Sequence, residues 1–317
     1  MRIVFFGTSE FVGAVKNARF LRGLIAAGMP PALVVTAPDV PSEHGRTGTL
    51  PAVKSAALAA GIPVLQPQSL VGFSGELAGY GADLSLVVAY GKILPPDVLA
   101  VPKFGSFGIH PSLLPRWRGP TPIQAAILAG DALTGVTIIQ MDAEMDHGPV
   151  VSRREFPLDG RPWAAPALSD ALTDLGLELF LEILTPLARG KIAVQPQDHA
   201  AATYSRMLKK EDGRIAWSRP AREIERMVRA FVPWPGAYTF WRSGAGELRL
   251  ALETAEYVMA DAEDRAAGTT FMKNDQLMVQ TGDGVLTVSR LTPEGARSMS
   301  GAEFLRGHPD IIGATLE

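Results

Sequence analysis

Short apolar runs alternate with helix-like segments through the first part of the chain, and this alternation constrains the fold more than any other feature. The apolar runs cover residues 2–6, 32–36, 63–65 and 84–89, and helical patterns lie near residues 11–27 and 52–60. A short apolar run closed by turn residues suits a strand buried on both faces of a parallel sheet. Repeated βα units of this kind predict an α/β fold, a Rossmann-like doubly wound parallel sheet with right-handed crossovers.

The chain also predicts a second, smaller domain. Its 317 residues exceed what one hydrophobic core usually holds. An apolar helical stripe over residues 168–183 is followed by Pro186 and by a polar link that begins at Arg189. Short alternating segments separated by turns then predict a small antiparallel, OB-like β-barrel. We expect a first domain over residues 1–188, a linker over 189–205 and a barrel domain over 206–317.

Composition excludes several classes of protein. The chain has no cysteine, which rules out disulfides, thiolate nucleophiles and cysteine zinc sites. It has no apolar run of 18 residues and begins on a strand pattern, so we expect a cytoplasmic protein without a membrane span or an export signal. After the first strand, Gly7-Thr8-Ser9 lacks the further glycines of a dinucleotide site, and no Walker motif occurs.

Two titratable residues follow strand-like runs in the middle of the chain. His110 ends the run 106–109, and Asp146 lies in the acidic loop after the run 136–141. Because ligands bind at the carboxyl edge of an open parallel sheet, we expect both residues at that edge. A carboxylate that faces an imidazole orients it and favours its protonated form. Sequence alone leaves open the simpler interpretation that His110 is held by a hydrogen bond and that Asp146 caps a turn.

Other chemistries fit these residues poorly. Residues 142–146 resemble the start of a calcium loop, but His147 stands where that loop needs glycine and the closing carboxylate is missing. Ser112 with His110 and Asp146 suggests a hydrolase triad, but no Gly-x-Ser-x-Gly elbow is present.

The stretch HPSLLPRWRGPTPIQ at residues 110–124, with the later Asp-His-Gly at 146–148, resembles the signature of the 10-formyltetrahydrofolate-dependent formyltransferases. Within that family, the likeness is to the members that formylate methionyl-tRNA. It extends over nearly the whole chain, including Arg-Ala-Phe-x-Pro-Trp-Pro-Gly-Ala at residues 229–237. The resemblance implies a catalytic first domain that uses 10-formyltetrahydrofolate as co-substrate and no metal, a tRNA-binding barrel domain, and a monomer.

The resemblance also implies roles for individual residues. His110 and Asp146 would assist direct attack of the amine of methionyl-initiator-tRNA on the formyl carbon, and which of them takes the proton stays open. The turn from Ser112 through Leu113 and Leu114 to Pro115 would line the folate pocket. Arg116 and Arg118 would meet the folate glutamate tail, tRNA phosphate or solvent.

One position departs from the family pattern. The catalytic asparagine is replaced by Gly108, and loss of one oxyanion donor typically costs on the order of 10² to 10³ in rate. Three explanations compete for a site that lacks this asparagine: a water molecule fills the space, a side chain such as Gln124 or His147 serves instead, or the protein retains binding with little turnover. We expect a slowed or rewired enzyme. A non-catalytic folate- or tRNA-binding protein and a transferase acting on an amino-sugar nucleotide remain alternatives.

Two basic regions are candidates for tRNA contact. The long polar loop at residues 37–48 contains Arg46. By resemblance, this loop corresponds to one that binds tRNA. Residues 206–229 contain eight basic and four acidic residues, and the expected helix there presents Arg222, Arg226 and Arg229 on one face. Such a face suits a phosphate backbone. A mobile surface loop and a solvated helix face are the competing interpretations.

Overall fold

The chain folds into two compact units. The computed structural model describes residues 1–8, 16–39, 50–158, 160–244, 246–259 and 265–317. The first unit comprises Met1–Ala126, Ala132–Gly160 and Ala167–Arg206, and the second comprises Ile127–Asp131, Arg161–Pro166 and Met207–Glu317.

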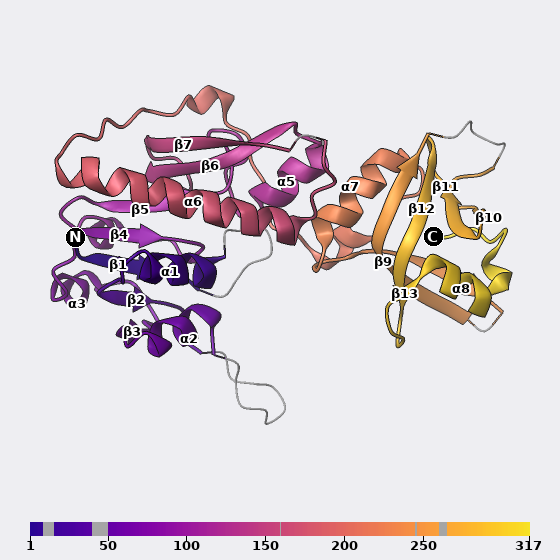
Figure 1. Ribbon diagram of the computed structural model, residues 1–317, viewed down its shortest axis with the longest axis horizontal. Coiled ribbons are helices and arrows are strands. Elements are labelled where there is room, and N and C mark those ends of the chain that lie inside the picture. The colour runs from indigo at the N-terminus through magenta and orange to yellow at the C-terminus, as the bar shows by residue number, and fades with distance from the viewer. Residues whose placement is uncertain (9–15, 40–49, 159, 245, 260–264) are drawn as a thin grey trace. The chain divides into compact units, whose positions relative to one another are not determined.

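A single sheet runs through the first unit in the order β3-β2-β1-β4-β5-β6-β7 (Figure 1). Its strands are β1 (Ile3–Phe6), β2 (Leu33–Val35), β3 (Val64–Leu65), β4 (Leu84–Val87), β5 (Ser106–His110), β6 (Leu133–Gln140) and β7 (Val150–Pro157). The helices of this part of the chain are α1 (Asn17–Ala26), α2 (Ala52–Ala59), α3 (Ser74–Ala78), α4 (Pro96–Leu99), α5 (Pro122–Ala129) and α6 (Ala165–Ala188). The first five strands pair in parallel, which confirms the predicted α/β class.

The far side of the sheet differs from the expectation. β6 pairs antiparallel with β5, and β7 pairs antiparallel with β6. Gln140, at the end of β6, therefore lies opposite Phe107, near the start of β5. The reasoning that placed Asp146 at the carboxyl edge of a parallel strand was wrong, because β6 runs against its neighbour.

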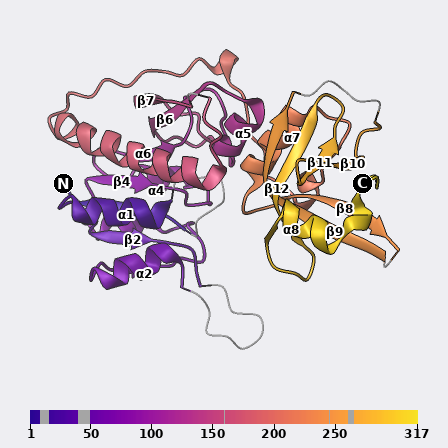
Figure 2. The same ribbon diagram turned by 45° about the vertical axis from the view of Figure 1, so that its right-hand side comes forward.

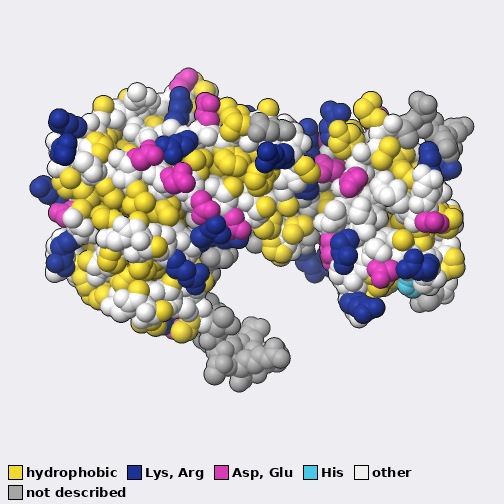
Figure 3. Space-filling view, in the orientation of Figure 1, with side chains coloured by type: hydrophobic (Ala, Val, Ile, Leu, Met, Phe, Trp, Pro, Cys, Tyr) yellow, Lys and Arg dark blue, Asp and Glu magenta, His cyan; other side chains and the backbone are white. Residues whose placement is uncertain are grey.

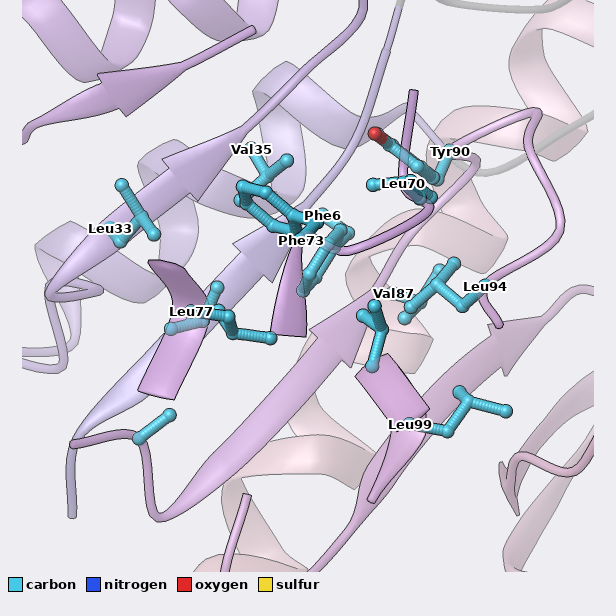
Figure 4. Packing of buried hydrophobic residues seen from close by; sticks show 13 residues of the cluster. Phe6, Leu33, Val35, Leu70, Phe73, Leu77, Val87, Tyr90, Leu94 and Leu99 are labelled. Carbon is cyan, nitrogen blue, oxygen red and sulfur yellow. The ribbon is translucent and has the colours of Figure 1, made fainter. Parts of the chain in front are cut away.

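Adjacent phenylalanines of β1 show how both faces of the sheet are covered. The Phe5 ring lies 6.5 Å from that of Phe20 on α1, which in turn lies 6.2 Å from Phe180 on α6. Figures 1 and 2 show α1 and α6 on this face. Phe6 points the other way because successive side chains of a strand alternate. It packs in a cluster with residues of α3 and α4, where its ring meets Tyr90 edge-on at 5.3 Å (Figure 4).

Tyr90 lies three residues beyond Val87, the last residue of β4. Burial raises the pKa of Tyr90 to about 12, and its hydroxyl has no hydrogen-bond partner among the described residues. The phenol therefore stays neutral at physiological pH, and Tyr90 packs as an aromatic ring at the carboxyl end of the sheet.

The described residues of the second unit include an antiparallel sheet and helices that pack against it. Its strand order is β10-β11-β12-β9-β8, and β13 pairs with β12. The strands are β8 (Ala237–Ser243), β9 (Gly246–Val258), β10 (Thr270–Lys273), β11 (Gln276–Gln280), β12 (Val285–Pro293) and β13 (Met299–Ser300), and the helices are α7 (Ala221–Phe231) and α8 (Gly301–Gly307). This curled antiparallel sheet confirms the predicted architecture of the second domain.

Residues 313–317 join the two outer strands of this sheet. Gly313 and Ala314 exchange backbone hydrogen bonds with Thr270 of β10. Glu317 exchanges two backbone hydrogen bonds with Phe240 of β8, at 2.9 and 3.0 Å. One short segment thus connects the strands at both ends of the sheet order.

Truncating Leu316 should therefore destabilise the second unit. Leu316 is 5% exposed, and Leu→Ala changes at buried sites typically cost about 2–5 kcal/mol through lost transfer energy and the cavity left behind. We expect Leu316→Ala to lower the free energy of unfolding by about that amount in urea denaturation of the full chain. Ile312→Ala is the matched control, because Ile312 is 44% exposed. Equal effects of the two substitutions would contradict a role for the segment in holding the sheet.

Candidate active site

His110 ends β5 and is 6% exposed. Its Nε2 lies 2.8 Å from the backbone oxygen of Trp117, and its Nδ1 lies 3.5 Å from Asp146 Oδ1. A carbonyl can only accept, so Nε2 carries a proton and donates it to Trp117.

Asp146 is held in a strained backbone position by neighbouring segments. Its φ is 52°, in the left-handed region that non-glycine residues rarely adopt. The N–H of Gly119 donates to Asp146 Oδ2 at 2.8 Å, which leaves Oδ1 directed toward His110. A Cβ at Gly148 would lie 1.9 Å from the backbone oxygen of Gln140, so only glycine permits this close approach of the loop to β6. Such outliers concentrate at functional sites.

The loops that follow two antiparallel strands, β5 and β6, thus converge on His110. The 111–119 loop after β5 supplies the Trp117 carbonyl and the Gly119 N–H, and the 141–149 loop after β6 supplies the Asp146 carboxylate. The structure brings His110 and Asp146 together through these two loops.

The Ser-Leu-Leu-Pro turn is fixed by hydrogen bonds within the first unit. The Ser112 hydroxyl donates to the backbone oxygen of Arg116 at 2.5 Å, so it does not face His110 as the nucleophile of a triad would. Thr137 of β6 donates to the Ser112 carbonyl and accepts from the Leu114 N–H. Ser112 and Leu114 are buried, while Leu113 and Pro115 are partly exposed.

Gly108 lies on β5 two residues before His110, beside side chains of β6 and the loop after it. A Cβ placed on Gly108 would meet Ile139 Cγ1 and Met141 Cγ at 3.4 Å, an ordinary van der Waals contact. A larger residue therefore fits here once the flexible Met141 side chain adjusts.

The two side chains considered as substitutes for the family asparagine have different surroundings. His147 Nδ1 bonds Asp142 Oδ2 at 2.7 Å, and its ring stacks on that of His199 with centroids 4.0 Å apart. Gln124 on α5 is fully buried, and neither its amide nitrogen nor its amide oxygen has a partner among the described residues. Of the two, Gln124 has the unused donor.

The basic residues suggested for tRNA contact have unequal exposure. Arg46 lies outside the described residues. Arg222 is exposed and stacks over the Tyr257 ring at 5.2 Å. Arg226 and Arg229 are half-buried within the second unit, where Arg226 donates to Ala129 O and Arg229 pairs with Glu225 and donates to Trp163 O. On the face shown in Figure 3, acidic and basic side chains of this unit are interspersed.

Sequence reasoning missed a buried polar cluster next to the site. Arg118 is 3% exposed, so it is not the surface contact that the sequence suggested as one option. Its guanidinium donates to the side chains of Gln197 and His199. No spacing signal identified Gln197 or His199, because both lie in the polar stretch expected to be a linker.

Two kinds of feature are absent from the described part of the chain. No group of three or more His, Cys, Asp or Glu side chains there is arranged to hold a metal ion. None of the described helices combines the length and apolar character needed to cross a bilayer.

Comparisons with known proteins agree with this architecture. A methionyl-tRNA formyltransferase from Chloroflexus aggregans is 44% identical over 97% of each chain, and one from Methylococcus capsulatus is 42% identical over 97% of each. Among solved structures, HypX from Aquifex aeolicus in complex with tetrahydrofolic acid shares the fold, with a TM-score of 0.63 at 20% identity over 96% of this chain and 47% of that chain. WlaRD, a sugar 3N-formyl transferase, has a TM-score of 0.62 at 14% identity over 94% of this chain and 99% of that chain.

Sequence profiles match both parts of the chain. The formyl transferase profile covers residues 1–184, and the profile of the formyl transferase C-terminal domain covers residues 207–309. Together with relatives that exceed 40% identity over nearly their whole length, these matches settle the family. The chain belongs to the formyl transferase family.

Proposed function

We propose that this protein transfers the formyl group of 10-formyltetrahydrofolate to the amino group of methionyl-initiator-tRNA. The observation that carries the proposal is the paired His110 and Asp146, 3.5 Å apart, inside a chain that is 44% identical to a methionyl-tRNA formyltransferase along its length. The paired residues provide the polar groups that amine attack on a formyl carbon requires.

The reaction forms a bond between the amine nitrogen and the formyl carbon and breaks the bond from that carbon to folate N10. One proton leaves the amine and one is delivered to N10. In this proposal, His110 donates to the formyl oxygen as it becomes anionic, exchanging its hydrogen bond to the Trp117 carbonyl for one to that oxygen. Asp146 holds the ring in orientation and stabilises its positive charge.

Binding is assigned to other parts of the two units. The turn Ser112–Pro115 lines the folate site, and the domain over residues 206–317 binds tRNA together with Arg46 and Arg222. Arg226 and Arg229 support this surface by fixing α7 rather than through free side chains, since both already bond atoms of the second unit. The catalytic domain extends over residues 1–188, with residues 189–205 between the two. In this proposal the protein acts as a cytoplasmic monomer.

A direct assay tests the proposal. The full chain is incubated with 10-formyltetrahydrofolate and methionyl-initiator-tRNA, and formyl-methionine is measured after hydrolysis of the tRNA ester. Formyl-methionine above the level of a His110→Ala control is the expected result.

Two other outcomes would overturn the proposal. Transfer to amino-sugar nucleotides but not to methionyl-tRNA would assign the protein to the sugar-modifying branch, whose structures share this fold. Binding of folate or tRNA without transfer to either acceptor would show a non-catalytic homologue, the alternative that Gly108 leaves open.

A further inference from the structure

The polar segment over residues 195–206 lies along both loops that form the site. At one end, Gln195 exchanges backbone hydrogen bonds with Val150, at the start of β7. Farther along, Thr203 accepts from the N–H groups of Trp117 and Arg118. The segment therefore packs as part of the first unit. It contacts the loop that follows His110 and the start of β7, which follows Asp146.

Gln197 is the residue of this segment that reaches inward. Its side chain is 6% exposed. The amide nitrogen donates to the backbone oxygens of Asp146 and Gly148, at 2.9 and 2.7 Å, and the amide oxygen accepts from the Arg118 guanidinium at 2.7 Å. One side chain thus fixes the backbone on both sides of His147, including the carbonyl of the left-handed Asp146.

The chemistry of these neighbours determines both the orientation and the identity of residue 197. Arg118 can only donate, and the carbonyls of Asp146 and Gly148 can only accept. The amide oxygen must therefore face the guanidinium and the amide nitrogen must face the loop. A glutamate would keep the contact with Arg118, but it would place a second acceptor against the two carbonyls. Leaving such buried carbonyls unpaired costs free energy.

The Arg118 nitrogen that donates to Gln197 also bonds a second side chain. This nitrogen, Nη2, lies 2.8 Å from His199 Nδ1, which must accept because guanidinium only donates. The His199 ring is stacked on His147, which bonds Asp142 at the start of the same loop. Arg118 is 3% exposed, and these bonds hold its guanidinium as a donor to Gln197.

We propose that Gln197 is a positioning residue for the reaction: with Arg118 behind it, it holds Asp146 in the left-handed conformation that directs the carboxylate to His110. This inference rests on the proposed role of His110 and Asp146 in formyl transfer. A misplacement of about 1 Å in a catalytic group costs on the order of 10²-fold in rate. Loss of the two Gln197 bonds releases the backbone that sets the position of Asp146.

The test compares Gln197→Glu with Gln195→Glu in the full chain. The two substitutions make the same chemical change two residues apart, but the Gln195 side chain is exposed. For Gln197→Glu we expect kcat of formyl transfer to fall about 10- to 100-fold, with KM for either substrate changed by less than about twofold. Gln195→Glu should match the unsubstituted protein. Equal kcat for the two variants would overturn the proposal. A change in KM with kcat unaffected would overturn it as well.

A second readout separates this inference from the proposed function. Nitrogen-15 NMR of the histidine rings should show the His110 signals displaced in Gln197→Glu and unchanged in Gln195→Glu. If the unsubstituted protein transfers no formyl group, the proposed function fails, and the NMR comparison still decides whether Gln197 positions the His110–Asp146 pair. If Gln197→Glu does not fold, Gln197→Met is compared in the same way, because it removes the bonds without adding charge.

Discussion

Asp146→Asn is expected to lower kcat of formyl transfer by about 10²- to 10⁴-fold, the range attributed to positioned acid-base groups. The amide has the shape of the carboxylate and can still accept from the Gly119 N–H, which lies 2.8 Å from Oδ2. It carries no charge toward His110 Nδ1, 3.5 Å from Oδ1. The variant therefore keeps the loop in place and removes the electrostatic support of the ring. Single-turnover kinetics with prebound substrates would measure the chemical step directly.

Glu144→Gln supplies the control for that experiment. Glu144 is exposed and lies in the same loop, so its neutralisation changes the net charge of the loop by the same amount. Its rate should stay within about twofold of the unsubstituted protein, as expected for a surface charge in solvent. A comparable loss in both variants would mean that loop charge, rather than contact with His110, determines the rate.

Gly108→Asn is expected to raise kcat by about 10²- to 10³-fold, the reverse of losing one oxyanion donor. The new side chain would project from β5 two residues before His110. Its Cβ would sit at 3.4 Å from Ile139 Cγ1 and Met141 Cγ, an ordinary van der Waals contact. The measurement is the initial rate of formyl-methionyl-tRNA formation at saturating substrates.

Gly108→Ala is the matched control, because it adds the same Cβ without a donor. Its rate should not rise. If the rate of Gly108→Asn also fails to rise while the variant folds normally, the missing asparagine amide does not limit the rate. Another donor then already serves in its place. Gln124, with its unpartnered amide, would then be the first side chain to replace.

Much of the first unit could be predicted from local patterns. The runs at residues 2–6 and 84–89 are predominantly apolar, and they form β1 and β4 because a central parallel strand is buried on both faces. The direction of β6 could not be predicted in this way. An apolar run has the same periodicity whichever way the strand runs. The loop between β6 and β7 approaches β6 closely at Gly148, and this contact is visible only in the structure.

The sequence predicted the residues of the site itself. It did not predict the buried residues that hold the loops of the site in place. His110 and the Ser-Leu-Leu-Pro turn form one short motif, so resemblance identified them. Gln197 and Arg118 are far apart in sequence and belong to no periodic pattern, and their contact depends on how residues 195–206 lie across the first unit. Polar composition suggested an exposed linker there, whereas Gln197 is buried because each of its amide atoms finds a partner.

The segment at residues 313–317 has a further consequence for how this protein behaves in crowded solution. Outer strands of a sheet present rows of unpaired backbone groups that recruit strands from other molecules and so seed aggregates. Here one stretch of backbone already occupies Thr270 on one outer strand and Phe240 on the other. A strand from another molecule that approached either place would have to displace that stretch first, so the second unit resists growth by strand addition at both of these positions.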